Sequence, residues 1–410
     1  MTIVVLSFFA CAVALLGLGS KLARAGRPSP PSIFAGVLVG LAISFIGLRP
    51  WITQFGAPLS IEPFIVLIAA AASWGVIRNQ VRITRHHVWW LLLVAITFWL
   101  SFRAAVEIPQ GAIVTAVAVL VTVCLRVSAI GVMVGFLLAG YSLLTASVWF
   151  TSLELGLRLS VLGENPIWIA RVGVLGAIAC LFLFATWRGR VLSALPLVAL
   201  VIYTGSRGPA LSLLAGGLVF IVLNSRRRAL PLTGIAVLGV ATPLLAPISV
   251  ANPVFGGPER LGSISVRLDT WRIAADVWLA NPFIGVGEPV DPRLLAGLVY
   301  PHNSLVEILA QSGLIGLALV LVAAVSAVRR PAAQALQVAL VTASWFSLTS
   351  GSVWGNWEMW VLLALTFSSR HASPPARDAD DDEPPTTAAG ESYRRSPSTR
   401  LSQRASGPPS

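Results

Sequence analysis

The residues of this chain best suited to acid–base chemistry lie in a short polar stretch in front of an apolar segment. Only four histidines occur in 410 residues, and His302 stands within PHNSLVEILAQSGLIG, residues 301–316. A neutral imidazole accepts a proton from a hydroxyl group, and a protonated imidazole binds phosphate. We expect His302 and Asn303 to lie just before a helix N-terminus, where backbone N–H groups and the helix dipole favour an anion.

The next residues set where that helix begins. Ser304 and Glu307 have the S-x-x-E spacing of a capping box, in which the two side chains accept hydrogen bonds from backbone N–H groups. The pattern predicts a helix that begins at Ser304. Glu307 could instead be a catalytic carboxylate, but we favour the structural role because the capping pattern accounts for it.

An arginine that could bind an anion lies in TGSRG, residues 204–208. The apolar run before it, 191–205, would make a helix only about 22 Å long, which is shorter than a bilayer core of roughly 30 Å. We therefore expect Arg207 near the depth of the lipid phosphates, where an arginine marks a functional pathway. Snorkelling to the interface or a structural ion pair is the alternative.

A second arginine-bearing segment, residues 262–282, has the pattern of an amphipathic helix. Four of its residues fall at helical spacing on one side: Leu268, Trp271, Ala275 and Trp278. The pattern predicts a helix that lies on the membrane surface with its tryptophans towards the lipid. It could also simply cap a helix bundle.

Spacing alone does not single out one arginine of this segment. Arg260, Arg267 and Arg272 could each face an anionic headgroup. Arg158 and Arg171 flank the start of another apolar run and are weaker candidates for substrate binding. Arg158 could be a solvated loop charge, and Arg171 could be a pairing charge.

The elements that position these residues are membrane helices. The chain is 56% hydrophobic and 11% charged, with a mean hydropathy of +0.81, which excludes an ordinary soluble domain. Its apolar runs are 1–20, 32–48, 61–77, 88–106, 112–125, 128–149, 167–186, 191–205, 209–223, 229–248, 304–328, 333–350 and 356–369. Runs of this length predict an all-α, polytopic transmembrane bundle.

The charges between the runs predict the orientation. Alternate connections are basic, with Lys21, Arg24, Arg27, Arg78, Arg82, Arg85, Arg126, Arg188, Arg190, Arg226 to Arg228, Arg329 and Arg330. Under the positive-inside rule these connections are cytoplasmic. Thirteen spans with an external N-terminus satisfy every loop, and twelve is the alternative because two runs are short. The first run lacks the features of a cleaved signal peptide.

This topology divides the chain into two parts. Residues 1–370 form the transmembrane domain, with an extracytoplasmic loop at 249–303 that contains the amphipathic helix. From residue 371 onward Pro, Ser, Arg and Asp dominate, and we expect a disordered cytoplasmic tail.

Two other classes of site are disfavoured. The cysteines Cys11, Cys124 and Cys180 lie inside apolar runs without metal-ligand spacing. The acidic stretch DADDDE in the tail has the pattern of a solvated charge run. The net charge of +12 resides in short loops between apolar runs, so it does not indicate nucleic-acid binding.

Taken in order, three motifs resemble the O-antigen ligase and polymerase superfamily of polytopic membrane glycosyltransferases. They are TGSRG at a helix start, SVRLDTWRIA…NPFIGVG in an outer loop, and PHNSLVEILAQSGLIGL. The resemblance covers about residues 150–330, and the earlier spans match only by hydropathy.

The resemblance implies an activity, partners and residue roles. The activity is transfer of a glycan from an undecaprenyl-diphosphate carrier to an acceptor hydroxyl group of a glycan or lipid-glycan. The reaction would occur at the outer face of the bacterial cytoplasmic membrane, without a metal ion or other cofactor. Arg207 and Arg267 would bind the diphosphate, and His302 would lie near the acceptor. The motifs leave open whether the reaction is ligation or polymerisation.

A membrane transporter or flippase for a lipid-linked or anionic substrate is the alternative from another class. Such proteins also have many spans and intramembrane arginines, but they typically contain internal repeats and broken helices near the bilayer midplane. The sequence shows no convincing repeat, and its informative polar residues collect on the predicted outer side.

Overall fold

The computed structural model describes residues 30–50, 62–150, 165–224, 258–291, 295, 301–328, 333–349 and 352–371. All of them belong to the unit that spans residues 1–372. The predicted runs 1–20 and 229–248, residues 372–410 of the predicted tail and Arg158 lie outside the described residues. His371, the first residue of the predicted tail, instead ends the last described helix. The count of twelve or thirteen spans therefore stays a prediction.

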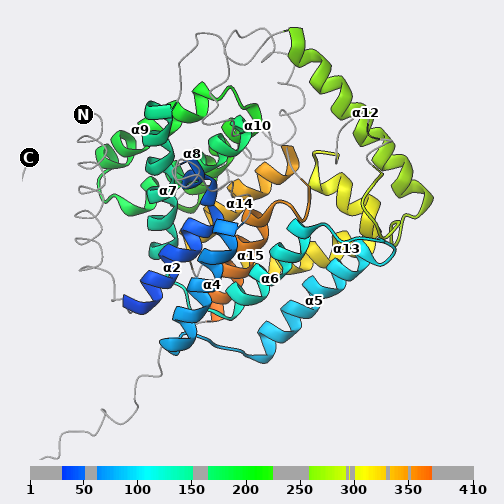
Figure 1. Cartoon of the computed structure of the whole chain (residues 1–410), viewed down its shortest axis with the longest axis horizontal. Coiled ribbons are helices and arrows are strands. Elements are labelled where there is room, and N and C mark those ends of the chain that lie inside the picture. Colours follow the sequence, from blue (N-terminus) through cyan, green and yellow to red (C-terminus); the bar gives the residue numbers. More distant parts are fainter. Residues whose placement is uncertain are drawn as a thin grey trace, which may run out of the picture. The chain divides into compact units, whose positions relative to one another are not determined.

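The described chain consists of helices and their connections (Figure 1), which confirms the all-α prediction. The helices are α2 Pro30–Ile43, η1 Phe45–Gly47, α4 Glu62–Ile77, α5 Arg85–Phe102, α6 Gln110–Cys124, α7 Ala129–Phe150, α8 Pro166–Leu183, α9 Trp187–Tyr203, α10 Arg207–Asn224, α12 Pro258–Ala280, α13 Ser304–Val328, α14 Gln334–Thr349 and α15 Trp357–His371. Each predicted apolar run within this part coincides with a helix, apart from a few residues at its ends.

Four of these helices are long and apolar enough to cross a membrane: Ala129–Trp149, Pro166–Leu183, Arg207–Asn224 and Ser304–Ala327. Three shorter helices are also apolar: Pro30–Ile43, Phe64–Ile77 and Gln110–Cys124. Many of their outward side chains are large and hydrophobic, as expected for surfaces that face lipid rather than water. The protein is therefore a polytopic helix bundle.

Connections that the charge pattern assigns to one side lie together in the structure. The backbone N–H of Arg82 donates to the carbonyl oxygen of Cys124 at 2.8 Å, and that of Arg126 donates to Gln80 at 2.7 Å. At the other set of connections, the N–H of Ala104 donates to Gly287 at 2.8 Å. The grouping of the loops agrees with the alternation read from the charges.

Small residues let α2 and α7 pack at close range. Gly40 and Gly135 face the partner backbone, and a Cβ atom on either would lie within 3.0 Å of backbone atoms of the opposite helix. Such glycines allow membrane helices to approach closely and gain van der Waals contact. This pair forms part of the core against which the later helices pack.

The predicted stripe of helix α12 is partly exposed and partly in contact with the protein, and its orientation towards lipid stays a prediction. The buried side of α12 is centred on Thr270 and Ala274, whereas Leu268 is 56% exposed. Trp271 and Trp278 are half-buried, and their indole N–H groups donate to backbone carbonyl groups of the protein. An indole N–H group usually needs a hydrogen-bond partner when it is partly buried. Both tryptophans of α12 find that partner in the protein backbone.

Helix α13, which lies beside α5 (Figure 1), is interrupted at Gly313, where φ is 64° and ψ is −165°. The loop that follows α12 fills the interruption. The N–H of Val286 donates to the carbonyl oxygen of Ala310 at 2.9 Å, and the N–H of Leu314 donates to Pro282 at 2.9 Å. Backbone groups freed by a broken membrane helix need such partners.

Arg103, at the C-terminal end of α5, fastens this loop. Its guanidinium donates to the carbonyl oxygen of Ile284 at 2.8 Å and to that of Gly285 at 2.6 Å. Sequence reasoning did not single out Arg103. The interruption of α13, the loop after α12 and the end of α5 are thus joined by hydrogen bonds.

Candidate functional site

Two of the three motifs meet at the C-terminal end of α14, and the third, which holds His302, contacts one of them through a hydrogen bond from Trp271 to Pro301. The Nη1 atom of Arg267 donates to the carbonyl oxygen of Thr349 at 3.0 Å. A Cβ atom on Gly208, the residue after Arg207, would collide with the side chain of Thr349. Arg267 in turn lies close enough to His302 to affect its ionisation. Thr349 therefore contacts two segments that lie 82 and about 140 residues before it in the chain.

His302 occupies a turn with an unusual backbone. Its φ is 58°, and the only other non-glycine residue with positive φ in the described chain is Asn79. The left-handed region is uncommon for residues with a side chain, although histidine enters it more readily than most. The imidazole is half-buried at the start of α13, where sequence analysis expected it.

Asn303, not Ser304, caps α13. Its Oδ1 atom accepts hydrogen bonds from the N–H groups of Leu305 at 3.0 Å and Val306 at 3.2 Å. Helix α13 begins at Ser304 as predicted, but the capping box expected of Ser304 and Glu307 does not form. The cap lies one residue earlier because an asparagine side chain satisfies the first N–H groups equally well.

Ser304 and Glu307 are instead held by the segment before α15. The Nδ2 atom of Asn356 donates to the Ser304 hydroxyl group at 3.0 Å. The Glu307 carboxylate accepts from the N–H of Val353 at 2.8 Å and from Nε2 of Gln311 at 3.0 Å. Glu307 is buried and serves to join α13 to the α14–α15 connection.

Burial is the first cause that lowers the pKa of His302, to about 4, and the positive charges of Arg267 and Arg171 add to it. Both causes act against the charged imidazolium form. The lower pKa means that the imidazole is neutral at neutral pH. A neutral imidazole can accept a proton, which is the property that a general base requires.

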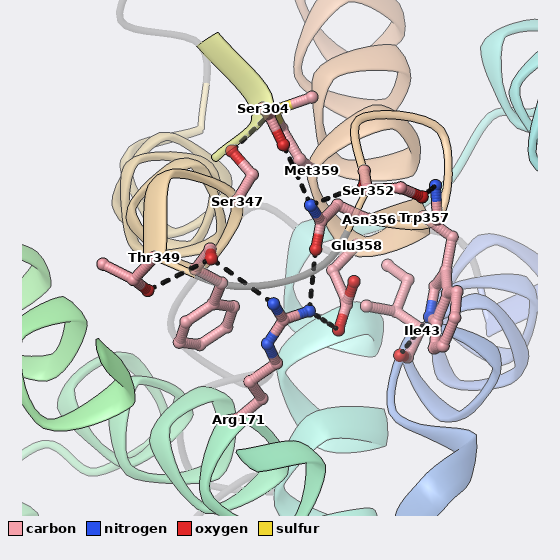
Figure 2. Close-up of polar contacts among 12 residues, drawn as sticks. Ile43, Arg171, Ser304, Ser347, Thr349, Ser352, Asn356, Trp357, Glu358 and Met359 are labelled. Carbon is pink, nitrogen blue, oxygen red and sulfur yellow. Dashed lines mark hydrogen bonds and ion pairs between the residues drawn. The ribbon is translucent and has the colours of Figure 1, made fainter. Parts of the chain in front are cut away.

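Arg171 lies at the centre of a buried polar cluster (Figure 2). Its Nη1 atom donates to Oδ1 of Asn356 at 2.9 Å and forms an ion pair with Glu358 at 3.3 Å. Its Nη2 atom donates to the carbonyl oxygen of Phe346 at 3.3 Å. The guanidinium also lies 4.3 Å from the centre of the Trp168 ring, a cation–π contact.

The cluster assigns Arg171 the pairing role that sequence analysis had left open. Its side chain is 1% exposed and its partner Glu358 is 4% exposed, so these charges compensate each other inside the bundle, as buried charges must. Through Asn356 and Ser304 the cluster reaches the N-terminus of α13, two residues from His302.

The remaining predicted arginines lie in different settings. Arg207 is half-buried and is the first residue of α10, two residues before the predicted run 209–223. Its depth relative to the lipid phosphates stays a prediction. Arg272 is exposed on α12, and Arg158 lies outside the described residues. The structure thus places Arg267 near His302, brings the residue after Arg207 to the same helix end as Arg267, and leaves Arg272 on the surface.

Sequence reasoning missed Asn356, Glu358 and Trp271 as parts of this neighbourhood. Glu358 carried a signal, because a carboxylate at the start of an apolar run needs a buried partner. Trp271 carried none, since tryptophans are common at membrane interfaces.

No group of three or more His, Cys, Asp or Glu side chains that could hold a metal ion occurs in the described part of the chain. The polar groups near His302 are mainly cationic or amide donors, which suit an anion better than a cation.

Comparison with known proteins finds a family model that covers the three motifs. No curated protein matches the chain. The family model described as O-Antigen ligase matches residues 191–321, a narrower range than the resemblance suggested. This range holds Arg207, Arg267 and His302, whereas Arg171 and Glu358 lie outside it. Over residues 191–321, therefore, the chain matches the O-antigen ligase family, and the resemblance to the O-antigen ligase and polymerase superfamily is confirmed.

Proposed function

We propose that this protein transfers a glycan from an undecaprenyl-diphosphate carrier to an acceptor hydroxyl group at the outer face of the bacterial cytoplasmic membrane. The observation that carries the proposal is the turn of His302 beside Arg267, inside the segment that matches the O-antigen ligase family. A neutral base next to a fixed cation suits a reaction that takes a proton from one substrate and releases an anion from the other.

In the proposed reaction the bond between the anomeric carbon and the phosphate oxygen breaks. The acceptor oxygen forms a new bond to that carbon, and its proton passes to the imidazole of His302. The electron pair of the broken bond stays on the departing diphosphate. We expect an inverting displacement. A general base in this role contributes roughly 10²- to 10⁴-fold to the rate.

The guanidinium groups of Arg207 and Arg267 would bind the diphosphate. Guanidinium groups bind phosphate oxygens in pairs of parallel hydrogen bonds and stay charged. In a partly dry site such donors stabilise the negative charge as it develops, and removal of one raises the barrier by about 2.7–4 kcal/mol. The Oδ1 atom of Asn303 is engaged as the helix cap, so its part in substrate binding would fall to the Nδ2 donor group of the same amide.

One observation bears on a transporter, namely the interruption of α13 at Gly313. Broken helices in transporters expose carbonyl groups that coordinate ions or substrates. Here the carbonyl oxygens of Ala310 and Gln311 accept hydrogen bonds from the loop at Val286 and Gly287. Because the loop occupies these groups, the interruption has a structural explanation and favours the transferase.

Transfer by the purified full-length protein tests the proposal. A polyprenyl-diphosphate-linked glycan serves as donor, and either a second donor molecule or a lipid-linked glycan serves as acceptor, in excess EDTA. We expect elongated product with the first acceptor for a polymerase and ligated product with the second for a ligase. No product with either acceptor would contradict glycan transfer, and activity only after Mg²⁺ addition would contradict the arginine-based mechanism.

Variants assign the roles. His302→Ala should lower the transfer rate by roughly 10²- to 10⁴-fold, and Arg207→Lys by about 10²-fold or more. His86→Ala, which removes an exposed histidine of α5, is the matched control and should leave transfer unchanged. Near-normal rates in both site variants would overturn the mechanism.

A further inference from the structure

The left-handed backbone of His302 requires anchors on both sides. A residue held in a sparsely populated region of φ/ψ space persists only where its surroundings fix it. On the C-terminal side the anchor is the cap, because Asn303 accepts hydrogen bonds from the first N–H groups of α13. The N-terminal side needs an anchor of its own.

Trp271 of α12 supplies that anchor. Its indole Nε1 donates to the carbonyl oxygen of Pro301 at 2.8 Å. This carbonyl belongs to the peptide group whose nitrogen is that of His302, so the bond fixes the plane from which the φ of His302 is measured. Pro301 is itself buried. This hydrogen bond matters because it acts on the peptide group directly before His302.

The same helix holds the neighbouring cation. Arg267 lies four residues before Trp271, so both side chains project from one side of α12. One binds the carbonyl oxygen of Thr349 at 3.0 Å and the other that of Pro301 at 2.8 Å. Helix α12 therefore spans from the end of α14 to the His302 turn and sets the spacing between imidazole and guanidinium.

We infer that Trp271 is a positioning residue whose indole N–H fixes the peptide group before His302 and with it the placement of the imidazole beside Arg267. The inference rests on the proposed function where it concerns turnover. The charged groups around His302 are Arg267 of α12 and Arg171 of α8, with Glu358 of α15 paired to Arg171. Glu307 of α13 is held by Val353 and Gln311.

Trp278 provides a matched control on the same helix. It is half-buried like Trp271, and its Nε1 atom donates to the carbonyl oxygen of a proline, Pro282, at 3.0 Å. That bond closes the turn after α12 and does not touch the peptide groups next to His302. The N–H of Leu314 donates to the same carbonyl oxygen at 2.9 Å, so Pro282 keeps this partner when the indole N–H is removed. If α12 simply needed its indole hydrogen bonds or its aromatic packing, substitution of either tryptophan would lower the transfer rate to the same extent.

The first test compares Trp271→Phe with Trp278→Phe, since phenylalanine keeps an aromatic ring and removes the N–H group. We expect Trp271→Phe to lower kcat for glycan transfer about 10- to 100-fold, the effect of a displaced catalytic group, with little change in the KM for the donor. Trp278→Phe should stay near the wild-type rate. Equal rates in the two variants, whether high or low, would overturn the inference.

The second test does not depend on turnover. In protein labelled with ¹⁵N-histidine, the His302 signal is assigned by its absence in His302→Ala and titrated in each variant. We expect His302 to titrate near pH 4 in the wild type and in Trp278→Phe, and closer to its ordinary value in Trp271→Phe. An unchanged titration in Trp271→Phe would contradict the inference, even if the wild type transferred no glycan.

Discussion

A single imidazole is the residue on which the proposed chemistry depends. His302 has a pKa of about 4, lowered first by burial and then by the charges of Arg267 and Arg171. Since the lowered pKa removes the proton, the base is available over the whole physiological range of pH. An exposed histidine with its ordinary pKa near 6.5 would be partly protonated there.

This shift predicts the pH dependence of transfer. The value of kcat/KM reports ionisations of the free enzyme, so its acid limb should fall near pH 4 instead of near pH 6.5. Arg267→Gln removes one cation that disfavours imidazolium, so the pKa of His302 should rise and the acid limb should move to higher pH. Profiles normalised to their own plateaus separate this shift from the loss of rate, and an acid limb at the same pH in both proteins would contradict the assignment.

Among the helices that the structure describes, α13 differs from the others in that it is interrupted. At Gly313 the backbone is left-handed, and a Cβ atom there would collide with the backbone of Phe283. The loop after α12 reaches the interruption only because this position has no side chain. The interruption sets the direction of the short N-terminal half of α13, which carries Glu307 and follows His302.

Gly313→Ala should therefore destabilise the protein. Alanine at positive φ is unfavourable, and with the collision the loss should exceed about 1 kcal/mol. Thermal unfolding in detergent, followed by loss of the monodisperse species, would measure it as a lower Tm. Gly217→Ala on α10 is the control, because nothing lies within 4 Å of its Cβ position and alanine favours a helix. A Tm equal in the two variants would show that the loop does not depend on Gly313.

Across the bundle, the cluster around Arg171 joins four helices drawn from distant parts of the chain. Arg171 belongs to α8, its acceptor Phe346 to α14, Glu358 to α15, and Ser304, reached through Asn356, to α13. The partners Arg171 and Glu358 are 187 positions apart. The cluster thus holds the helices that surround the His302 turn in one arrangement.

Removal of one member of the buried pair should be more harmful than removal of both. Arg171→Met or Glu358→Gln leaves a buried charge without compensation, which costs about 3–5 kcal/mol. The double variant leaves neither charge, so its loss in unfolding stability should be smaller than the sum of the two single losses. Thermal unfolding of the three variants measures this coupling, and strictly additive losses would contradict a direct interaction.

The sequence alone determined the helices and the chemistry available to them. Apolar runs of fixed length and the charges between them are local properties, and they were enough to predict an all-α bundle with helices close to their observed bounds. The three motifs were enough to select Arg207, Arg267 and His302, and the O-antigen ligase family model covers all three.

Only the tertiary structure decided which groups meet. The side chain of Asn303 forms the cap, while the Ser304 hydroxyl group accepts a hydrogen bond from Asn356 instead. Arg171 became a structural charge because Glu358 reaches it. The tie from Trp271 to Pro301 likewise joins residues 30 positions apart. Such contacts depend on how the helices pack against one another, and the hydropathy of a single segment does not predict which helix it packs against.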